Sequence, residues 1–235
     1  MKFSLDPDWK DLDLDTLLRL ADADGVARGR LAGSARLETR AKDVASGLDH
    51  LSGTFDVRLT DGAITDLNLA GATLDNLNAV PRLREAVQRR ARAQAPGLVA
   101  GTSEIASLLL RGRVARRRVE LEEIRLASSD YGLEAHGTVS FDGTADLDGT
   151  LALSDDASRS LVSESGVLAI LAPPGSPVRI PVEIKGTYPR FASSPTSEYV
   201  SRVMARAIAP SGSGSAAEML RRLFGGRSRG EGGAE

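Results

Sequence analysis

The chain has 235 residues, 41% of them hydrophobic, and its 30 basic and 32 acidic residues give a formal net charge of −2. It is long enough for one substantial domain or two small ones, and it has no overall positive field that would attract nucleic acid. The absence of cysteine excludes disulfides, thiolate catalysis and thiolate ligands for a metal. No apolar run approaches the roughly 20 residues that cross a bilayer, and the N-terminus lacks the apolar core of a signal peptide. We therefore expect neither a transmembrane nor a signal segment in this chain.

Residues 1–24 are expected to be a lead-in that continues a longer protein. Their leucines and acidic residues allow a short helix before Gly25. Residues 26–40 combine small and charged side chains, which we interpret as strand. A β-rich domain is therefore expected over residues 25–195.

Residues 51–59 alternate between apolar and polar side chains, as in a strand with one buried face. The apolar side chains of this face are Leu51, Phe55, Val57 and Leu59. Asp61-Gly62 follows, a dipeptide typical of tight turns, and apolar residues resume at Ile64. The sequence therefore predicts a hairpin that reverses at Asp61-Gly62.

The spacing of apolar residues then changes to three or four, from Leu74 to Val87, and predicts a helical insertion over about residues 72–95. Pro81 would kink this helix. The arginines between its apolar positions are Arg82, Arg84, Arg89, Arg90 and Arg92. Such a helix could lie on a membrane surface with these arginines at the lipid phosphates, or it could cap the sheet and leave them in water. The sequence favours the two alternatives equally.

The clearest alternation of the chain lies between Ile105 and Leu153. Residues 131–141 and 145–153 flank Asp142-Gly143 and predict a second hairpin.

Strands are also expected at residues 105–110 and 119–126. In the second of these, the apolar phase changes at Glu122-Glu123. A β-bulge there would let both halves of the strand face the core.

The tip between these strands, residues 111–118, holds the densest positive charge of the chain. It could contact lipid phosphates or nucleic acid. We favour a solvated turn whose charge is balanced by Glu120, Glu122 and Glu123.

Ser154 and the two aspartates after it are typical of a helix N-cap, and apolar spacing predicts a helix over residues 157–171. A strand is expected over residues 178–184, and Pro181 should place it at an edge or a bulge.

Helices are expected over residues 196–224, the clearer one at 196–209, before a disordered Gly- and Arg-rich tail at 225–235. Together these patterns predict a mainly β protein with α-helices (α+β). We expect an antiparallel twisted sheet or a β-groove of hairpins, with capping amphipathic helices and a helical C-terminus.

Reactive side chains are sparse in this sequence. The two histidines, His50 and His136, lie in different segments without ligand-type neighbours, so we expect no metal site. Asp146 and Asp148 share one face of a strand but lack a third ligand. The sequence has no phosphate-binding glycine loop or nucleophile elbow. We therefore expect neither an enzyme nor a cofactor.

Three runs carry a resemblance to a known family: residues 51–69 (LSGTFDVRLTDGAITDLNL), 121–143 (LEEIRLASSDYGLEAHGTVSFDG) and 178–190 (VRIPVEIKGTYPR). Their order resembles the C-terminal region of AsmA-like bacterial envelope proteins, the AsmA/TamB-type β-groove proteins. In that family a helical insertion follows the first hairpin, a meander of strands comes next, and a segment like the last run closes the domain. The resemblance covers residues 25–195 and depends on the order of the runs.

This resemblance implies a location on the periplasmic side of the inner membrane and a role in phospholipid transport and outer-membrane biogenesis or homeostasis. The family's membrane anchor and most of its groove have no counterpart here, which suggests a fragment of a longer protein or a truncated paralogue.

A continuous apolar sheet face must be covered by helices, by a second sheet or by a ligand. We hypothesise that it binds phospholipid acyl chains through Phe55, Val57, Leu59, Leu133, Val139, Phe141, Leu147 and Leu151. In the alternative, helices cover this face and the domain caps a larger periplasmic assembly, docking other envelope proteins through its edge strands without binding lipid itself. Nucleic acid is not expected as a partner.

Overall fold

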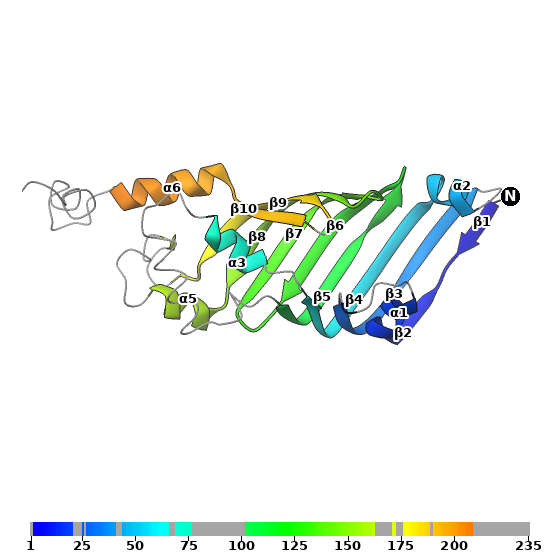
Figure 1. The fold of residues 1–235 in the computed structure, drawn as a ribbon, viewed down its shortest axis with the longest axis horizontal. Coiled ribbons are helices and arrows are strands. Elements are labelled where there is room, and N and C mark those ends of the chain that lie inside the picture. The colour runs from blue at the N-terminus through cyan, green and yellow to red at the C-terminus, as the bar shows by residue number, and fades with distance from the viewer. Residues whose placement is uncertain are drawn as a thin grey trace, which may run out of the picture.

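The computed structural model describes residues 2–20, 25, 27–40, 44–65, 69–76, 102–162, 171–172, 176–188 and 190–208. Within them the protein is mainly antiparallel β-sheet with a few short helices, as predicted (Figure 1). The strands are β1 (Lys2–Leu5), β2 (Asp8–Asp13), β3 (Ala27–Arg40), β4 (Ser52–Thr65), β5 (Thr102–Ala115), β6 (Arg118–Ala127), β7 (Tyr131–Ser140), β8 (Thr144–Leu153), β9 (Arg179–Thr187) and β10 (Arg190–Pro195). The helices are α1 (Leu14–Leu20), α2 (Val44–Asp49), α3 (Leu69–Asp75), α5 (Asp155–Val162) and α6 (Ser197–Ile208).

The strands form a single sheet in the order β1-β3-β4-β5-β6-β7-β8-β9-β10, and β2 also pairs with β3. β1 pairs with the C-terminal part of β3 through Leu5 and Leu37, whereas β2 pairs with its N-terminal part through Leu12 and Leu31. The sheet therefore begins at Lys2, upstream of the domain boundary expected at residue 25.

The predicted hairpin at Asp142-Gly143 is confirmed. β7 and β8 pair on either side of it, Gly143 has a φ of 86°, and the Asp142 carboxylate accepts a hydrogen bond from the Thr144 amide at 2.9 Å. The tip between the strands predicted at 105–110 and 119–126 is also present, as a two-residue turn at Arg116 and Arg117 that joins β5 to β6.

The predicted hairpin at Asp61-Gly62 is wrong, because β4 passes straight through this dipeptide. β4 remains paired with β3 on one side and with β5 on the other, up to Ile64. Asp61 takes a φ of 49°, and the register with β3 shifts between Arg28 and Arg30. The irregular backbone that this dipeptide favours therefore forms a bulge within one long strand and not a turn.

The predicted bulge in β6 is confirmed at Glu122. Arg111 pairs with Glu123 and the next residue, Gly112, pairs with Leu121, so that Glu122 is the extra residue. Leu121 and Ile124 consequently both pack against the apolar core. The bulge therefore keeps the two halves of β6 facing inward.

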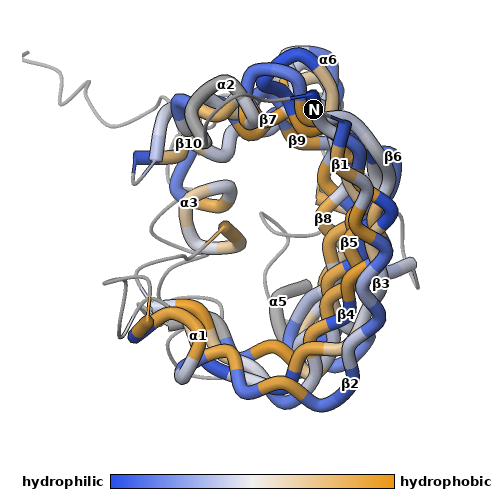
Figure 2. Tube along the Cα trace, turned by 90° about the vertical axis from the view of Figure 1, so that its right-hand side faces the viewer, coloured by the Kyte–Doolittle hydropathy of each residue, from blue (hydrophilic) through white to orange (hydrophobic). Residues whose placement is uncertain are grey.

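The sheet curls so that its apolar side lies inside (Figure 2). Gly53 in β4 and Gly137 in β7 have φ angles of 151° and 142°. A Cβ atom at these positions would lie 2.0 Å from the Arg36 carbonyl oxygen and 2.3 Å from that of Asp146. Only glycine tolerates both this backbone conformation and this close approach, which accompany bending of a sheet.

The C-terminal elements begin where the sequence predicts. Ser154 caps α5, since its hydroxyl accepts a hydrogen bond from the Ala157 amide at 3.2 Å. The Pro181 carbonyl accepts a hydrogen bond from the Thr196 amide at 2.9 Å, just past the end of β10. The prediction that Pro181 places this strand at an edge or a bulge is wrong, because β9 pairs with both β8 and β10 and its register with β8 is regular around Pro181. The nitrogen of a strand residue points to the same side as its carbonyl, so the missing N–H of Pro181 faces the point where β10 ends and leaves the pairing with β8 intact.

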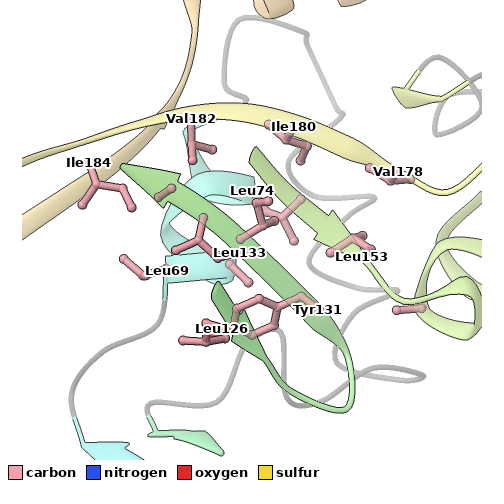
Figure 3. Packing of buried hydrophobic residues seen from close by; sticks show 14 of the residues in the cluster. Leu69, Leu74, Leu126, Tyr131, Leu133, Leu153, Val178, Ile180, Val182 and Ile184 are labelled. Carbon is pink, nitrogen blue, oxygen red and sulfur yellow. The ribbon is translucent and has the colours of Figure 1, made fainter. Parts of the chain in front are cut away.

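The apolar core lies between α3 and the strands from β6 to β9 (Figure 3). Leu69 and Leu74 of α3 belong to one cluster of buried residues with Leu133, Ile180 and Val182. α3 begins at Leu69, ends at Asp75 and overlaps only the first residues of the helix predicted over residues 72–95. The rest of that prediction, residues 163–170 of the helix predicted over 157–171, the helical stretch predicted beyond Ile208 and the tail lie outside the described residues.

Candidate functional site

A single row of aliphatic side chains crosses the sheet from β2 to β9. Neighbours in this row are paired across adjacent strands, and paired residues of antiparallel strands lie on the same face. We call this set the leucine row: Leu12, Leu31, Leu59, Leu108, Leu126, Leu133, Leu151 and Ile180. All of its members except Leu12 belong to the buried apolar cluster or pack against it.

Coverage of this apolar face differs between its two ends. Leu151 and Ile180 have no exposed surface, whereas Leu12 at the other end of the row is 39% exposed. On β1, Phe3 and Leu5 face the same way and are 49% and 61% exposed. The apolar face is therefore closed over β7 to β9 and open to solvent at β1 and β2.

α3 covers the closed end and is held there by polar contacts with β10. The hydroxyls of Thr73 and Ser193 lie 2.7 Å apart, and Thr73 donates to the Leu69 carbonyl at 2.7 Å. The Asn76 side-chain amide donates to the Ser193 carbonyl at 2.8 Å. Because Thr73 and Ser193 are almost fully buried, these hydrogen bonds fix α3 over the sheet.

The eight residues predicted to face lipid divide into two groups. Leu59, Leu133 and Leu151 lie in the protein core with at most 4% of their surface exposed, so other side chains of the protein already cover them. The other five are only partly buried: Phe55, Val57, Val139, Phe141 and Leu147. Only this second group has surface left for a ligand.

Four members of the partly buried group lie on the same face as the leucine row, farther along the strands: Val57 is one same-face position away and Val139 is three. Phe141 lies in the turn after β7. Phe55 and Leu147 belong to one cross-strand row, which runs through Gly112, Leu121 and Gly137. The glycines in this row remove side-chain bulk between the larger residues. The arginines predicted to reach a membrane surface, Arg82, Arg84, Arg89, Arg90 and Arg92, lie outside the described residues.

The exposed apolar residues of β1 and β2 were not predicted from the sequence. Phe3 and Leu5 alternate with polar residues, which is a strand signal, but the segment is only four residues long and precedes Pro7. Pairing with β3 supplies the backbone hydrogen-bond partners that so short a segment lacks by itself.

The outer face of the sheet carries paired charges. The Arg111 guanidinium donates to Asp56 at 2.9 Å and to Glu123 at 2.8 Å, and the Asp56 hydrogen bond is the main cause that raises the pKa of Arg111. Arg113 donates to Glu120 at 2.8 Å, and Arg117 pairs with Asp49. The arginine-rich segment 111–118 is thus largely engaged with carboxylates, as the solvated-turn interpretation predicts.

Side chains of catalytic type are dispersed over this outer face. His136 is exposed and lies across from Asp148, while Asp146 forms an ion pair with Lys185 at 3.7 Å. The described residues include no group of three or more His, Cys, Asp or Glu side chains that could hold a metal ion. Among the same residues, no helix is both long and apolar enough to cross a bilayer.

The partly open apolar face is consequently the strongest candidate for a functional site. Comparison of the chain with protein-family models, with curated proteins and with solved structures found no match.

Proposed function

We propose that this chain is a non-enzymatic module of the bacterial cell envelope that binds phospholipid acyl chains along the apolar face of its sheet. The observation that carries the proposal is the leucine row, which crosses the sheet and emerges from protein cover at Leu12. Apolar surface exposed in a contiguous patch favours contact with a partner or a lipid. The resemblance to AsmA-like proteins supports a periplasmic location and a role in outer-membrane biogenesis or homeostasis.

In this proposal the curled sheet acts as a groove that α3 caps at one end. Acyl chains would contact the partly buried group and the exposed residues of β1 and β2, whereas the core residues Leu59, Leu133 and Leu151 would only support the sheet. Burial of one methylene contributes about 0.8 kcal/mol, so a modest stretch of acyl chain is enough for stable binding.

A second function is favoured by the burial of those three core residues. If protein side chains cover the whole face, the module would bind no lipid and would instead cap a larger assembly through the free edges at β1, β2 and β10.

The experiment that separates the two functions is native mass spectrometry with lipid extraction, on protein purified from a Gram-negative host without harsh detergent. Acyl-chain binding predicts near-stoichiometric phospholipid on the wild type and its loss from Val139→Asp/Leu147→Asp. Ser140→Asp/Thr144→Asp adds the same charge to the same hairpin, on or next to the outer face, and should keep the lipid.

Val139→Asp/Leu147→Asp is also expected to weaken folding, because both positions are half-buried. A second variant, Phe3→Ser/Leu5→Ser, changes exposed residues and should leave the circular dichroism spectrum unchanged while lowering the amount of bound lipid. A lipid-free wild-type monomer would sink the acyl-chain proposal and favour the capping module.

A further inference from the structure

A separate pocket of about 530 Å³ lies where α6 runs past the start of β9. None of the eight residues predicted to face lipid lines it. Its floor includes Leu171, Tyr199 and Val203, and its rim carries Arg179, Arg202 and Arg206. The volume lies within the range of ordinary small-molecule sites.

The floor of this pocket is apolar and well ordered by its contacts. Leu171 and Val203 are at most 2% exposed, and the Tyr199 hydroxyl donates a hydrogen bond to the Leu171 carbonyl at 3.0 Å. Burial raises the pKa of Tyr199 to about 12, so this hydroxyl stays neutral near pH 7. The floor therefore offers a neutral apolar surface.

The rim carries positive charge from two different elements. Arg202 and Arg206 are four residues apart on α6, which puts them on one face of the helix, and Arg179 comes from β9. No aspartate or glutamate lines the pocket among the described residues. Arg202 forms an ion pair with Glu198 at 3.7 Å, but Glu198 is 83% exposed and does not line the pocket.

The positive charges of Arg206 and Arg202 each lower the pKa of Tyr199, whereas burial raises it by more. Both arginines therefore interact electrostatically with the floor of the pocket. Guanidinium groups bind phosphate oxygens through paired hydrogen bonds, which gives them an advantage over lysine at such sites. An apolar floor beneath a rim of guanidiniums is complementary to an anion that carries an apolar tail.

We propose that this pocket binds the phosphate group of an anionic phospholipid. The rim arginines hold the phosphate, and the apolar floor receives the glycerol backbone and the first methylenes of an acyl chain. Arg179 and Pro181 of the pocket flank Ile180 of the leucine row, so the pocket lies on the opposite face of the sheet from the proposed acyl-chain surface. The inference therefore adds a second lipid site, and it rests on the proposed function for the choice of a lipid over a free phosphate compound.

The test is calorimetric titration of the full chain with monomeric dihexanoylphosphatidylglycerol, dihexanoylphosphatidylcholine and inorganic phosphate. The wild type should bind phosphatidylglycerol most tightly. Arg179→Gln/Arg202→Gln should weaken this binding about tenfold or more, since a hydrogen bond to a charged group contributes ~1.5 kcal/mol or more. Both side chains are exposed, so the fold should persist.

The matched control is Arg58→Gln/Arg159→Gln, which removes the same charge at arginines that are 66% and 76% exposed and lie outside the pocket. It should bind phosphatidylglycerol like the wild type. Equal affinity for the two lipids, or equal losses in the two double variants, would overturn the head-group site. Inorganic phosphate binding as tightly as the lipid would overturn the assignment to a lipid.

The two proposals fail separately. The Val139 and Leu147 variants leave the pocket unchanged, and the arginine variants leave the acyl-chain face unchanged. Phospholipid retained by Arg179→Gln/Arg202→Gln without any preference for an anionic head group would sink the head-group site alone.

Discussion

Leu12 and Ile180 lie at opposite ends of one row of cross-strand neighbours, yet Leu12 is 39% exposed and Ile180 is completely buried. Both are large aliphatic residues on the same face of the same sheet. The difference therefore comes from what lies over them, because α3 packs over the Ile180 end. One apolar face thus combines a core with an exposed surface.

The two ends of the leucine row should respond differently to truncation. Leu151→Ala leaves a cavity in the closed end and should lower the free energy of unfolding by about 3 kcal/mol. Leu12→Ala removes a partly exposed side chain and should cost less than ~1 kcal/mol. Urea unfolding followed by circular dichroism measures both. Equal losses would show that Leu12 is as well packed as Leu151.

The turn between β5 and β6 should be a source of strain. Arg116 and Arg117 have φ angles of 52° and 60°, a conformation that suits a two-residue hairpin turn but favours asparagine and glycine. Arg116→Asn/Arg117→Gly should raise the free energy of unfolding by about 1 kcal/mol, even though it removes the surface ion pair to Asp49. Thermal unfolding measures the gain. An unchanged or lower midpoint would contradict this reading of the turn.

Gly137 should not tolerate a side chain. Its φ is 142°, and a Cβ atom would lie 2.3 Å from the Asp146 carbonyl oxygen. Gly137→Ala should therefore destabilise the protein by about 2 kcal/mol or more. Gly132→Ala is the control on the same strand, since a Cβ atom there would lie 3.3 Å from its nearest neighbour, the Leu126 carbonyl oxygen. This variant should lower the free energy of unfolding by less than ~1 kcal/mol. Chemical unfolding of both variants tests whether the glycine is required.

Tyr199 should make stability depend on alkaline pH. Its pKa is raised from 10.0 to about 12 in the folded protein, chiefly by burial. The folded state then holds the phenolic proton more tightly than the unfolded state does. The stability contribution is fully present below pH 10 and is lost as the pH rises to about 12, by ~2 kcal/mol.

Tyr199→Phe removes this titration and supplies the comparison. The variant should be less stable than the wild type near neutral pH, because it loses the hydrogen bond to the Leu171 carbonyl. The difference in unfolding free energy between the two proteins should shrink between pH 10 and pH 12. A constant difference across that range would contradict the raised pKa.

Two Asp-Gly dipeptides show how far local pattern predicts the fold. Asp142-Gly143 reverses the chain as expected, whereas Asp61-Gly62 lies inside β4. Both dipeptides favour positive φ angles, and both positions use one. Whether such an angle becomes a turn or a bulge depends on the neighbouring strands. β3 and β5 continue on both sides of Asp61, and this long-range pairing keeps the strand extended.

The candidate site was also predictable from the sequence only in part. Alternation correctly places Phe55 and Leu147 on the apolar face, because side chains of a strand alternate between the two faces. It cannot distinguish them from Leu59 and Leu151, which carry the same pattern but lie beneath other parts of the protein. The pocket at α6 was missed, because Arg179 and Arg202 are distant in the sequence and meet only through the packing of α6 against β9.

The sequence by itself determined the strand-rich class, the position of the bulge at Glu122 and the N-cap of α5 at Ser154, since these depend on neighbours a few residues apart. The tertiary structure alone decided the pairing of β1 and β2 with β3 and the cover over one end of the leucine row. It also decided the convergence of arginines at α6. The physical reason is that burial and charge convergence depend on which distant segments come together, and periodicity records only the side of an element on which a residue lies.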